Sequence, residues 1–148
     1  SAILMAEYDP VPCQITTIEN YEKRIPIARE NFKRAGKEAQ IALLEGDAAE
    51  VLKTLEGPYD FIFMDAAKGQ YMEFFPHCMK MLNEGGLLIS DNILYKGMTA
   101  TDELLVRRKV TIVRRLRKYL EMLRDSSELS TAIIPIGDGV AISYKERK

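Results

Sequence analysis

The chain has 148 residues, of which 47% are hydrophobic and 29% are charged, and its formal net charge is -1. A chain of this length can bury one core but is short for two, so we expect a single domain over residues 1–148. No apolar run approaches the roughly 20 residues of a membrane span, and no signal-like segment is present, so we expect no membrane partner. Cys13 and Cys78 form no CxxC or disulfide framework, which favours a reducing, cytoplasmic setting.

The predicted elements alternate between helix and strand. Helical composition occupies four segments in chain order: 1–8, 21–35, 48–55 and 70–82. Four short apolar runs have the length and β-branched content of buried strands: 14–19, 41–47, 59–66 and 86–92. Pro26 limits where the second helix begins, and Pro76 interrupts the fourth. The alternation predicts βαβ units and therefore a mostly parallel sheet in an α/β fold.

The C-terminal part has a different pattern. One long helix is predicted from Asp102 to about Arg124, followed by strands over 130–136 and 140–145. Gly137-Asp138-Gly139 joins these strands as a hairpin turn, so the final strand should run antiparallel to its neighbours.

The N-terminus lacks an expected segment. An open α/β sheet normally begins with a strand and a glycine-rich loop before its first helix, and neither precedes residues 1–8 here. Loss of an inner strand would leave unpaired backbone on two neighbours. We therefore expect further residues before Ser1 in the intact protein.

Side chains with oxygen atoms lie at the end of every predicted strand in the first part of the chain. They are Glu19, Asp47, Asp65, and Asp91 with Asn92. Each of them singly could be an ordinary helix cap or turn residue. Because ligands of open parallel sheets bind at the carboxyl ends of the strands, four such ends in succession favour a binding site.

Two kinds of chemistry fit these positions. A carboxylate such as Glu19 can accept hydrogen bonds from both ribose hydroxyls of a nucleoside, and Asp47 of Gly46-Asp47-Ala48 can accept from a base amine. Asp65, Asp91 and Asn92 are hard oxygen donors, and Mg²⁺ prefers such donors with positions left for water and substrate. The sequence thus predicts a nucleoside cofactor and a divalent cation.

The ordered motifs TIE (17–19), GDA (46–48), FMDAAK (63–68) and SDN (90–92) resemble those of the cation-dependent class I O-methyltransferases, the group of catechol and caffeoyl-CoA methyltransferases. Within this group, the segments DAAKGQY, SDNILYKG and TAIIPIGDGVAIS are most similar to those of the bacterial tRNA 5-hydroxyuridine methyltransferases, which methylate the wobble-position hydroxyl. The resemblance covers essentially the whole chain.

The resemblance implies a Rossmann-like class I methyltransferase fold, S-adenosyl-L-methionine (SAM) as cofactor, Mg²⁺ or Mn²⁺ as the metal, and a homodimer. It implies these residue roles: Ser1 at the cofactor carboxylate, Glu19 at the ribose, Asp47 and Ala48 at the adenine, Asp65 beside the cofactor, Asp65, Asp91 and Asn92 as metal ligands, and Lys68 as the catalytic lysine. The alternative for Lys68 is a solvated loop lysine. The family's first strand and glycine-rich loop are absent, so a protein that began at Ser1 should bind SAM poorly.

Charge distribution bears on the substrate. Nine Lys or Arg against three Asp or Glu lie between Lys96 and Arg124, mostly in a basic helix at 107–118. A solvated helix surface is one explanation; contacts to RNA phosphates are another. We expect methylation of tRNA, with a small catechol-like or CoA-linked phenol as the alternative substrate. A non-catalytic nucleotide-binding module or an NAD oxidoreductase is a more remote alternative, since hydride transfer needs no such metal ligands.

Overall fold

The computed structural model describes residues 1–11 and 13–147. They form two compact units, Ser1–Leu55 and Glu56–Lys148, and the expectation of a single domain stays a prediction. Within the described residues, no helix is long and apolar enough to cross a membrane.

The first unit contains a two-stranded parallel sheet. Its elements are α1 (Ala2–Tyr8), β1 (Ile15–Glu19), α2 (Arg24–Arg34), β2 (Ile41–Glu45) and α3 (Ala48–Thr54). Strands β1 and β2 pair in register from Ile15 with Ile41 to Glu19 with Glu45. The helix predicted from residue 21 begins at Arg24, which puts Pro26 in the first turn, where a missing N–H costs no helical hydrogen bond.

The second unit contains a four-stranded sheet in the order β3-β4-β6-β5. Its elements are β3 (Tyr59–Met64), the 3-10 turn η1 (Lys68–Gln70), α4 (Tyr71–Met81), β4 (Leu82–Asp91), the 3-10 turns η2 (Asp102–Leu104) and η3 (Arg107–Lys109), α5 (Val110–Asp125), β5 (Leu129–Ile134) and β6 (Val140–Lys145). Strands β3 and β4 are parallel, and β6 runs antiparallel to both of its neighbours. The α/β class and the antiparallel final strand are therefore confirmed.

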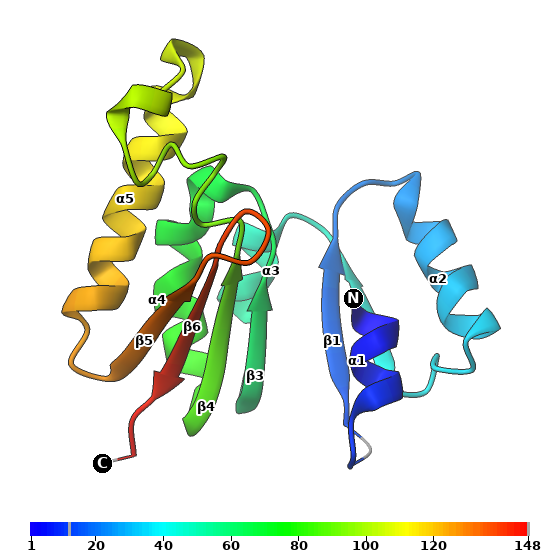
Figure 1. Ribbon diagram of the computed structural model, residues 1–148. Coiled ribbons are helices and arrows are strands. Elements are labelled where there is room, and N and C mark those ends of the chain that lie inside the picture. The colour runs from blue at the N-terminus through cyan, green and yellow to red at the C-terminus, as the bar shows by residue number, and fades with distance from the viewer. Residues whose placement is uncertain (12, 148) are drawn as a thin grey trace. The chain divides into compact units, whose positions relative to one another are not determined.

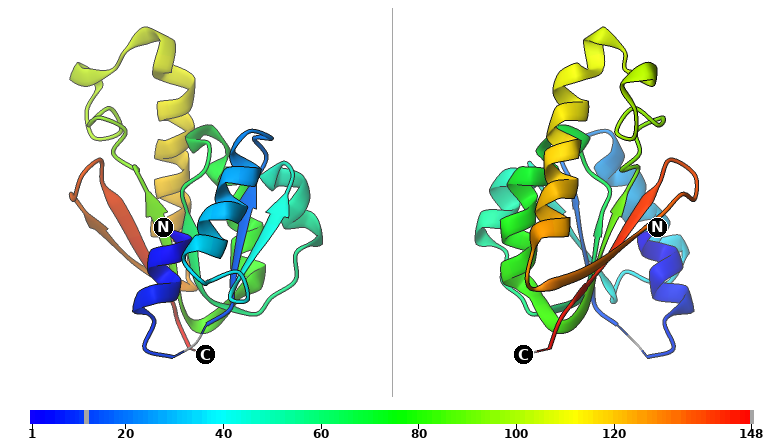
Figure 2. Two further views of the ribbon diagram at one scale, coloured as in Figure 1. Left: turned by 90° about the vertical axis from the view of Figure 1, so that its right-hand side faces the viewer. Right: turned by 60° about the vertical axis from the view of Figure 1, so that its left-hand side comes forward.

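Helices α4 and α5 cover one face of this sheet (Figures 1 and 2). Alternation along β4 turns Leu88 and Ser90 toward the helices, and both are fully buried. The Ser90 hydroxyl lies 2.6 Å from the Tyr119 hydroxyl of α5, so each buried polar group has a partner. The Tyr119 ring meets the edge of the Tyr71 ring at a centroid distance of 5.4 Å, which locks α5 against the start of α4.

The helix predicted from Asp102 is wrong over its first eight residues, because α5 begins only at Val110. Arg117 explains the difference: its guanidinium donates to the carbonyl groups of Met98 and Thr99 and pairs with Asp102 at 2.7 Å. In one straight helix, Asp102 and Arg117 would lie about 22 Å apart along the axis. The chain instead folds back along α5 through η2 and η3.

Two smaller predictions near β4 also need correction. Helix α4 is continuous through Pro76, although the sequence predicted an interruption there. The strand predicted from residue 86 begins at Leu82, directly after α4. The β3–β4 ladder is irregular there, since Tyr59 pairs with Leu82 and Phe61 with Leu87.

Candidate active site

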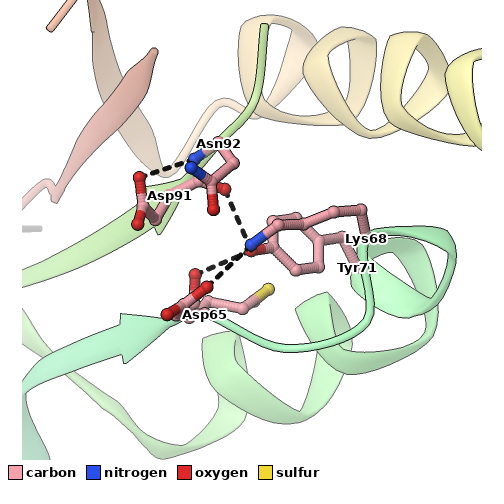
Figure 3. Close-up of polar contacts among 6 residues, drawn as sticks. Asp65, Lys68, Tyr71, Asp91 and Asn92 are labelled. Carbon is pink, nitrogen blue, oxygen red and sulfur yellow. Dashed lines mark hydrogen bonds and ion pairs between the residues drawn. The ribbon is translucent and has the colours of Figure 1, made fainter. Parts of the chain in front are cut away.

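The ends of β3 and β4 bring four of the predicted residues together. The last register pair of the two parallel strands is Met64 with Ser90. Asp65 follows β3 directly, while Asp91 ends β4 and precedes Asn92. Figure 3 shows these side chains and Lys68 around the same edge of the sheet. The strand-end rule thus correctly located this cluster within the second unit.

Lys68 is held inside the cluster. The short turn η1 starts at Lys68, three residues after Asp65, and points its side chain back toward that carboxylate. Its Nζ donates to Asp65 Oδ1 at 2.8 Å and to the Tyr71 hydroxyl at 2.9 Å. The Lys68 side chain is only 15% exposed, against 52% for Asp65. A solvated loop lysine does not fit this burial, and one of its three N–H groups remains for a ligand.

Asn92 has a constrained backbone. Its φ is 53°, in the left-handed region, and its N–H donates to Asp91 Oδ1 at 2.7 Å. Tyr95 and Lys96 also have positive φ values, of 47° and 60°. Non-glycine residues rarely adopt this conformation, and they persist in it only where the surroundings impose it. The segment after β4 is therefore a candidate ligand-binding loop.

The hairpin between β5 and β6 holds this loop. The backbone N–H groups of Ile93 and Leu94 donate to the carbonyl oxygens of Gly139 and Asp138, at 3.0 and 2.9 Å. A Cβ on Gly139 would lie 2.3 Å from Leu94 Cγ, so the close approach requires glycine. The sequence pattern Gly137-Asp138-Gly139 predicted the turn but contained no sign of this support for the site.

The donor set at this edge fits a hard divalent cation. Asp65, Asp91 and Asn92 offer carboxylate and amide oxygens, and Asp65 and Asp91 are not fully buried, so that water and substrate oxygens can complete a coordination shell. Among the described residues, no group of three or more His, Cys, Asp or Glu is placed to hold a metal. The predicted set of Asp65, Asp91 and Asn92 differs from such a group because Asn92 contributes an amide. Metal binding by these three residues stays a proposal.

The predicted nucleoside-binding residues lie in the first unit. Glu19 Oε1 accepts from the N–H groups of Asn20 and Tyr21 at 3.1 and 2.9 Å, and Oε2 lies 4.0 Å from Arg24 Nη1. The ends of β1 and β2 are adjacent, since the Gly46 N–H donates to the Glu19 carbonyl at 3.1 Å. The sequence prediction of a strand through residue 47 is therefore two residues too long.

Asp47 also has an ordinary structural role. Its side chain caps α3 by accepting from the Ala49 N–H at 2.9 Å, while Ala48 is the first residue of that helix. Ser1 is the N-cap residue of α1 but makes no side-chain cap bond. The structure places Ser1, Glu19, Asp47 and Ala48 in one unit, and their cofactor roles stay predictions.

Tyr71 is a site residue that the sequence reasoning missed. Its ring is fully buried, and its hydroxyl lies 2.9 Å from the Met64 carbonyl oxygen and 3.0 Å from that of Asp91. Burial, with smaller contributions from the charges of Asp65 and Asp91, raises the pKa of Tyr71 well above its ordinary value, so the phenol stays protonated. The available signal was the spacing Asp65-Lys68-Tyr71, three residues apart each time.

A basic surface lies beside this cluster, although it is not one helix as predicted. We define the basic surface by its exposed members: Arg107 and Arg108 of η3, and Arg114, Arg115 and Lys118 of α5. Arg115 Nη1 donates to the Gly69 carbonyl at 3.3 Å, one residue after Lys68. Lys109 Nζ lies 5.7 Å from the centroid of the Tyr95 ring in the loop after Asn92. Cationic side chains therefore contact both segments that flank the site.

Comparison with known proteins identifies relatives of the chain. Residues 1–146 match the family model described as O-methyltransferase. The catechol O-methyltransferase of Niastella koreensis is 34% identical over 101 residues, which are 66% of this chain and 46% of that protein. Caffeoyl-CoA O-methyltransferase 2 of Populus trichocarpa is 31% identical over 134 residues, covering 84% of this chain and 52% of that protein. The chain thus spans about half the length of the curated relatives that it matches.

Solved structures agree with the family match. A Staphylococcus aureus protein assigned as a caffeoyl-CoA O-methyltransferase is 34% identical with a TM-score of 0.87, covering 97% of this chain and 69% of that one. An SAH-bound methyltransferase from Podospora anserina is 29% identical with a TM-score of 0.80, covering 90% of this chain and 61% of that one. The α/β arrangement described above is that of these class I methyltransferases.

Proposed function

Because the chain belongs to the O-methyltransferase family, we propose that the protein transfers a methyl group from SAM to a hydroxyl oxygen, with Mg²⁺ or Mn²⁺ bound at the site. The observation that carries this proposal is the placement of Lys68 Nζ, 2.8 Å from Asp65 and largely buried, at the sheet edge where Asp91 and Asn92 also lie. The SAH-bound relative from Podospora anserina supports SAM, since SAH is SAM without its methyl group. Family membership favours this function over an NAD oxidoreductase or a non-catalytic nucleotide-binding module.

The chemistry requires an activated oxygen. The methyl group leaves the sulfonium of SAM as its bond to the acceptor oxygen forms, and the acceptor hydroxyl loses its proton. Asp65, Asp91 and Asn92 would hold the divalent cation, whose positive charge would lower the pKa of that hydroxyl. Lys68 acts on the same oxygen, either by taking its proton or by donating its remaining N–H to the oxyanion. In the first unit, Glu19, Asp47, Ala48 and Ser1 are the proposed contacts to SAM.

The proposed acceptor is the 5-hydroxyl of 5-hydroxyuridine at the wobble position of tRNA. This nucleoside has a carbonyl oxygen next to the hydroxyl, and two adjacent oxygens suit a cation site that orients the nucleophile. The basic surface supports a polyanionic substrate, because its Arg115 and the neighbouring Lys109 contact the segments on both sides of the site, and such side chains can position phosphates without reading the sequence. A cytoplasmic location follows from such a substrate.

A small phenol is the second candidate. The similarity to a catechol and to caffeoyl-CoA O-methyltransferases favours it, and a catechol also offers two adjacent oxygens. The CoA part of a thioester is polyanionic too, so the basic surface fits either substrate. Homodimer formation stays a prediction.

Transfer of labelled methyl groups from SAM separates these candidates. The protein is incubated with Mg²⁺ and either tRNA containing 5-hydroxyuridine, catechol or caffeoyl-CoA. We expect label in tRNA, and we expect R114Q/K118Q to raise the KM for tRNA and to flatten its salt dependence, with catechol turnover unchanged. K33Q/R34Q on α2 is the matched control, since it removes two exposed cations from a helix with no proposed role.

The outcomes are distinct. Label in a phenol but not in tRNA contradicts the tRNA proposal and leaves the methyltransferase intact. No label in any acceptor contradicts methyl transfer itself.

A further inference from the structure

We propose that Tyr71 is a positioning residue that sets the spacing between the two strand ends bearing Asp65 and Asp91 and fixes Lys68 between them. The inference rests on the proposed function, since it concerns the same site. It goes further by assigning a role to a buried phenol that donates no group to the reaction.

The Tyr71 hydroxyl continues the β3–β4 ladder by one step. Backbone pairing of these strands ends at Met64 with Ser90, one residue before Asp65 and Asp91. The phenol oxygen lies 2.9 Å from the Met64 carbonyl oxygen and 3.0 Å from that of Asp91, so its one proton is shared between the two strands. The two candidate metal-binding carboxylates are therefore attached to backbone segments that one side chain holds together.

The same oxygen also accepts a hydrogen bond. Lys68 Nζ donates to it at 2.9 Å, and the ammonium lies 5.2 Å from the centroid of the Tyr71 ring. With the bond to Asp65, this gives Lys68 two fixed partners and one direction for its remaining N–H. Figure 3 shows the phenol at the centre of this group, with Asp65 on one side and Asp91 with Asn92 on the other.

Packing prevents the hydroxyl from moving. The Tyr71 ring is 0% exposed and meets the Tyr119 ring edge to face. Tyr119 is itself fully buried and is tied to Ser90 of β4 through its hydroxyl, at 2.6 Å. The phenol oxygen thus has a position determined by the core rather than by solvent.

Tyr119 also provides a matched control. Y71F and Y119F each remove one buried hydroxyl and keep the ring, but only Tyr71 contacts the site. Loss of a group that orients metal ligands typically costs 10- to 100-fold in metal affinity or activity. We expect Y71F to weaken Mn²⁺ binding, measured by electron paramagnetic resonance titration, and to lower kcat, each by about 10-fold or more. The KM for SAM should stay unchanged. Y119F should alter Mn²⁺ affinity and kcat by no more than about twofold, while both variants lower the melting temperature similarly.

A double variant tests the route through Lys68. If Tyr71 acts partly by positioning Lys68, Y71F should lower kcat by a smaller factor in K68M than in the unsubstituted protein, while it should weaken Mn²⁺ binding in both. Independent, multiplying losses in the double variant would overturn that part of the inference.

Each remaining outcome decides the question. Equal Mn²⁺ affinities and kcat values for Y71F and Y119F would overturn the positioning role while leaving the proposed function standing, provided that the unsubstituted protein transfers methyl groups. Loss of cooperative melting in Y71F would show that the phenol acts in stability, and it would overturn the positioning role as well. A protein without substitutions that neither binds Mn²⁺ nor transfers methyl groups would contradict the proposed function first.

Discussion

Replacement of Lys68 by methionine separates its stabilising contacts from its proposed chemistry. Methionine keeps the apolar stem but removes the ammonium that contacts Asp65 and Tyr71. Because the Asp65 side chain is 52% exposed, solvent screens the ion pair, which we expect to contribute about 0.5–1 kcal/mol. The bond to the Tyr71 hydroxyl adds about 1 kcal/mol. The free energy of unfolding should therefore fall by about 1–2 kcal/mol, a shift of several degrees in Tm, and the protein should remain folded.

The expected effect on catalysis is larger. A side chain that takes the proton of the acceptor or stabilises its oxyanion contributes about 10²–10⁴-fold to a reaction rate, equivalent to about 3–5 kcal/mol of barrier. K68M should therefore lower kcat for methyl transfer by at least about 100-fold while SAM binding is retained. Steady-state kinetics with labelled SAM, with thermal melts of the same samples, measure both quantities.

A matched variant controls for the loss of a charge. K53M breaks the ion pair of Lys53 with Glu50, which has the same spacing of three residues and an N–O distance of 2.6 Å. Both partners are exposed, so K53M should change stability by no more than about 0.5 kcal/mol, and it should leave kcat unchanged. A K68M protein with a kcat close to that of K53M would refute a chemical role for Lys68.

Three further predictions concern the hairpin turn, the thiols and alkaline stability. G139A should lower the free energy of unfolding in urea by more than about 2 kcal/mol, because the added Cβ would lie 2.3 Å from the Leu94 side chain. G137A meets no atom within 4 Å and should lower it by only about 1 kcal/mol, the cost of a left-handed backbone. Equal losses for the two variants would contradict the close packing at Gly139. Burial raises the pKa of the Cys78 thiol to about 12, so in the native protein Ellman's reagent should react with the partly exposed Cys13 and not with Cys78, and two equally reactive thiols would be inconsistent with this burial. Burial also raises the pKa of Tyr119, so above about pH 10 the unfolded state loses the phenol proton while the native state keeps it, and the free energy of unfolding falls with pH. Y119F should make this fall less steep by about 1.4 kcal/mol per pH unit, and an unchanged pH dependence would contradict the raised pKa of Tyr119.

Local patterns predicted the order of the elements well. Strands β1 to β4 lie within or next to predicted runs, because β-branched apolar stretches and short polar turns decide such segments locally. The Gly137-Asp138-Gly139 turn predicted the antiparallel final strand correctly, since two strands joined by so short a connection can only form a hairpin. Strand ends were predicted too far into the following loops by up to two residues, because the backbone turns at Gly46 and after Met64.

Contacts between distant residues decided the features that the sequence did not reveal. The fold-back of 98–102 depends on Arg117, which a helical projection places simply among outward-facing cations. Tyr71 belongs to a pattern of apolar residues along α4, and only the folded structure shows its hydroxyl reaching the ends of two strands. The strand-end rule did assemble Asp65, Asp91 and Asn92, because parallel strands that pair must end at one edge.

We propose that Asp65, Asp91 and Asn92 bind a cation on which O-methylation by this protein depends, separately from SAM binding. The decisive measurement is methyl transfer from labelled SAM, titrated with Mg²⁺ in the unsubstituted protein and in D91A. We predict transfer that rises with Mg²⁺ and stops on chelation, no transfer by D91A at any Mg²⁺ concentration, and SAM binding by D91A that is mostly intact. Transfer that persists in D91A or after chelation would contradict the claim, as would an equal loss of SAM binding and transfer.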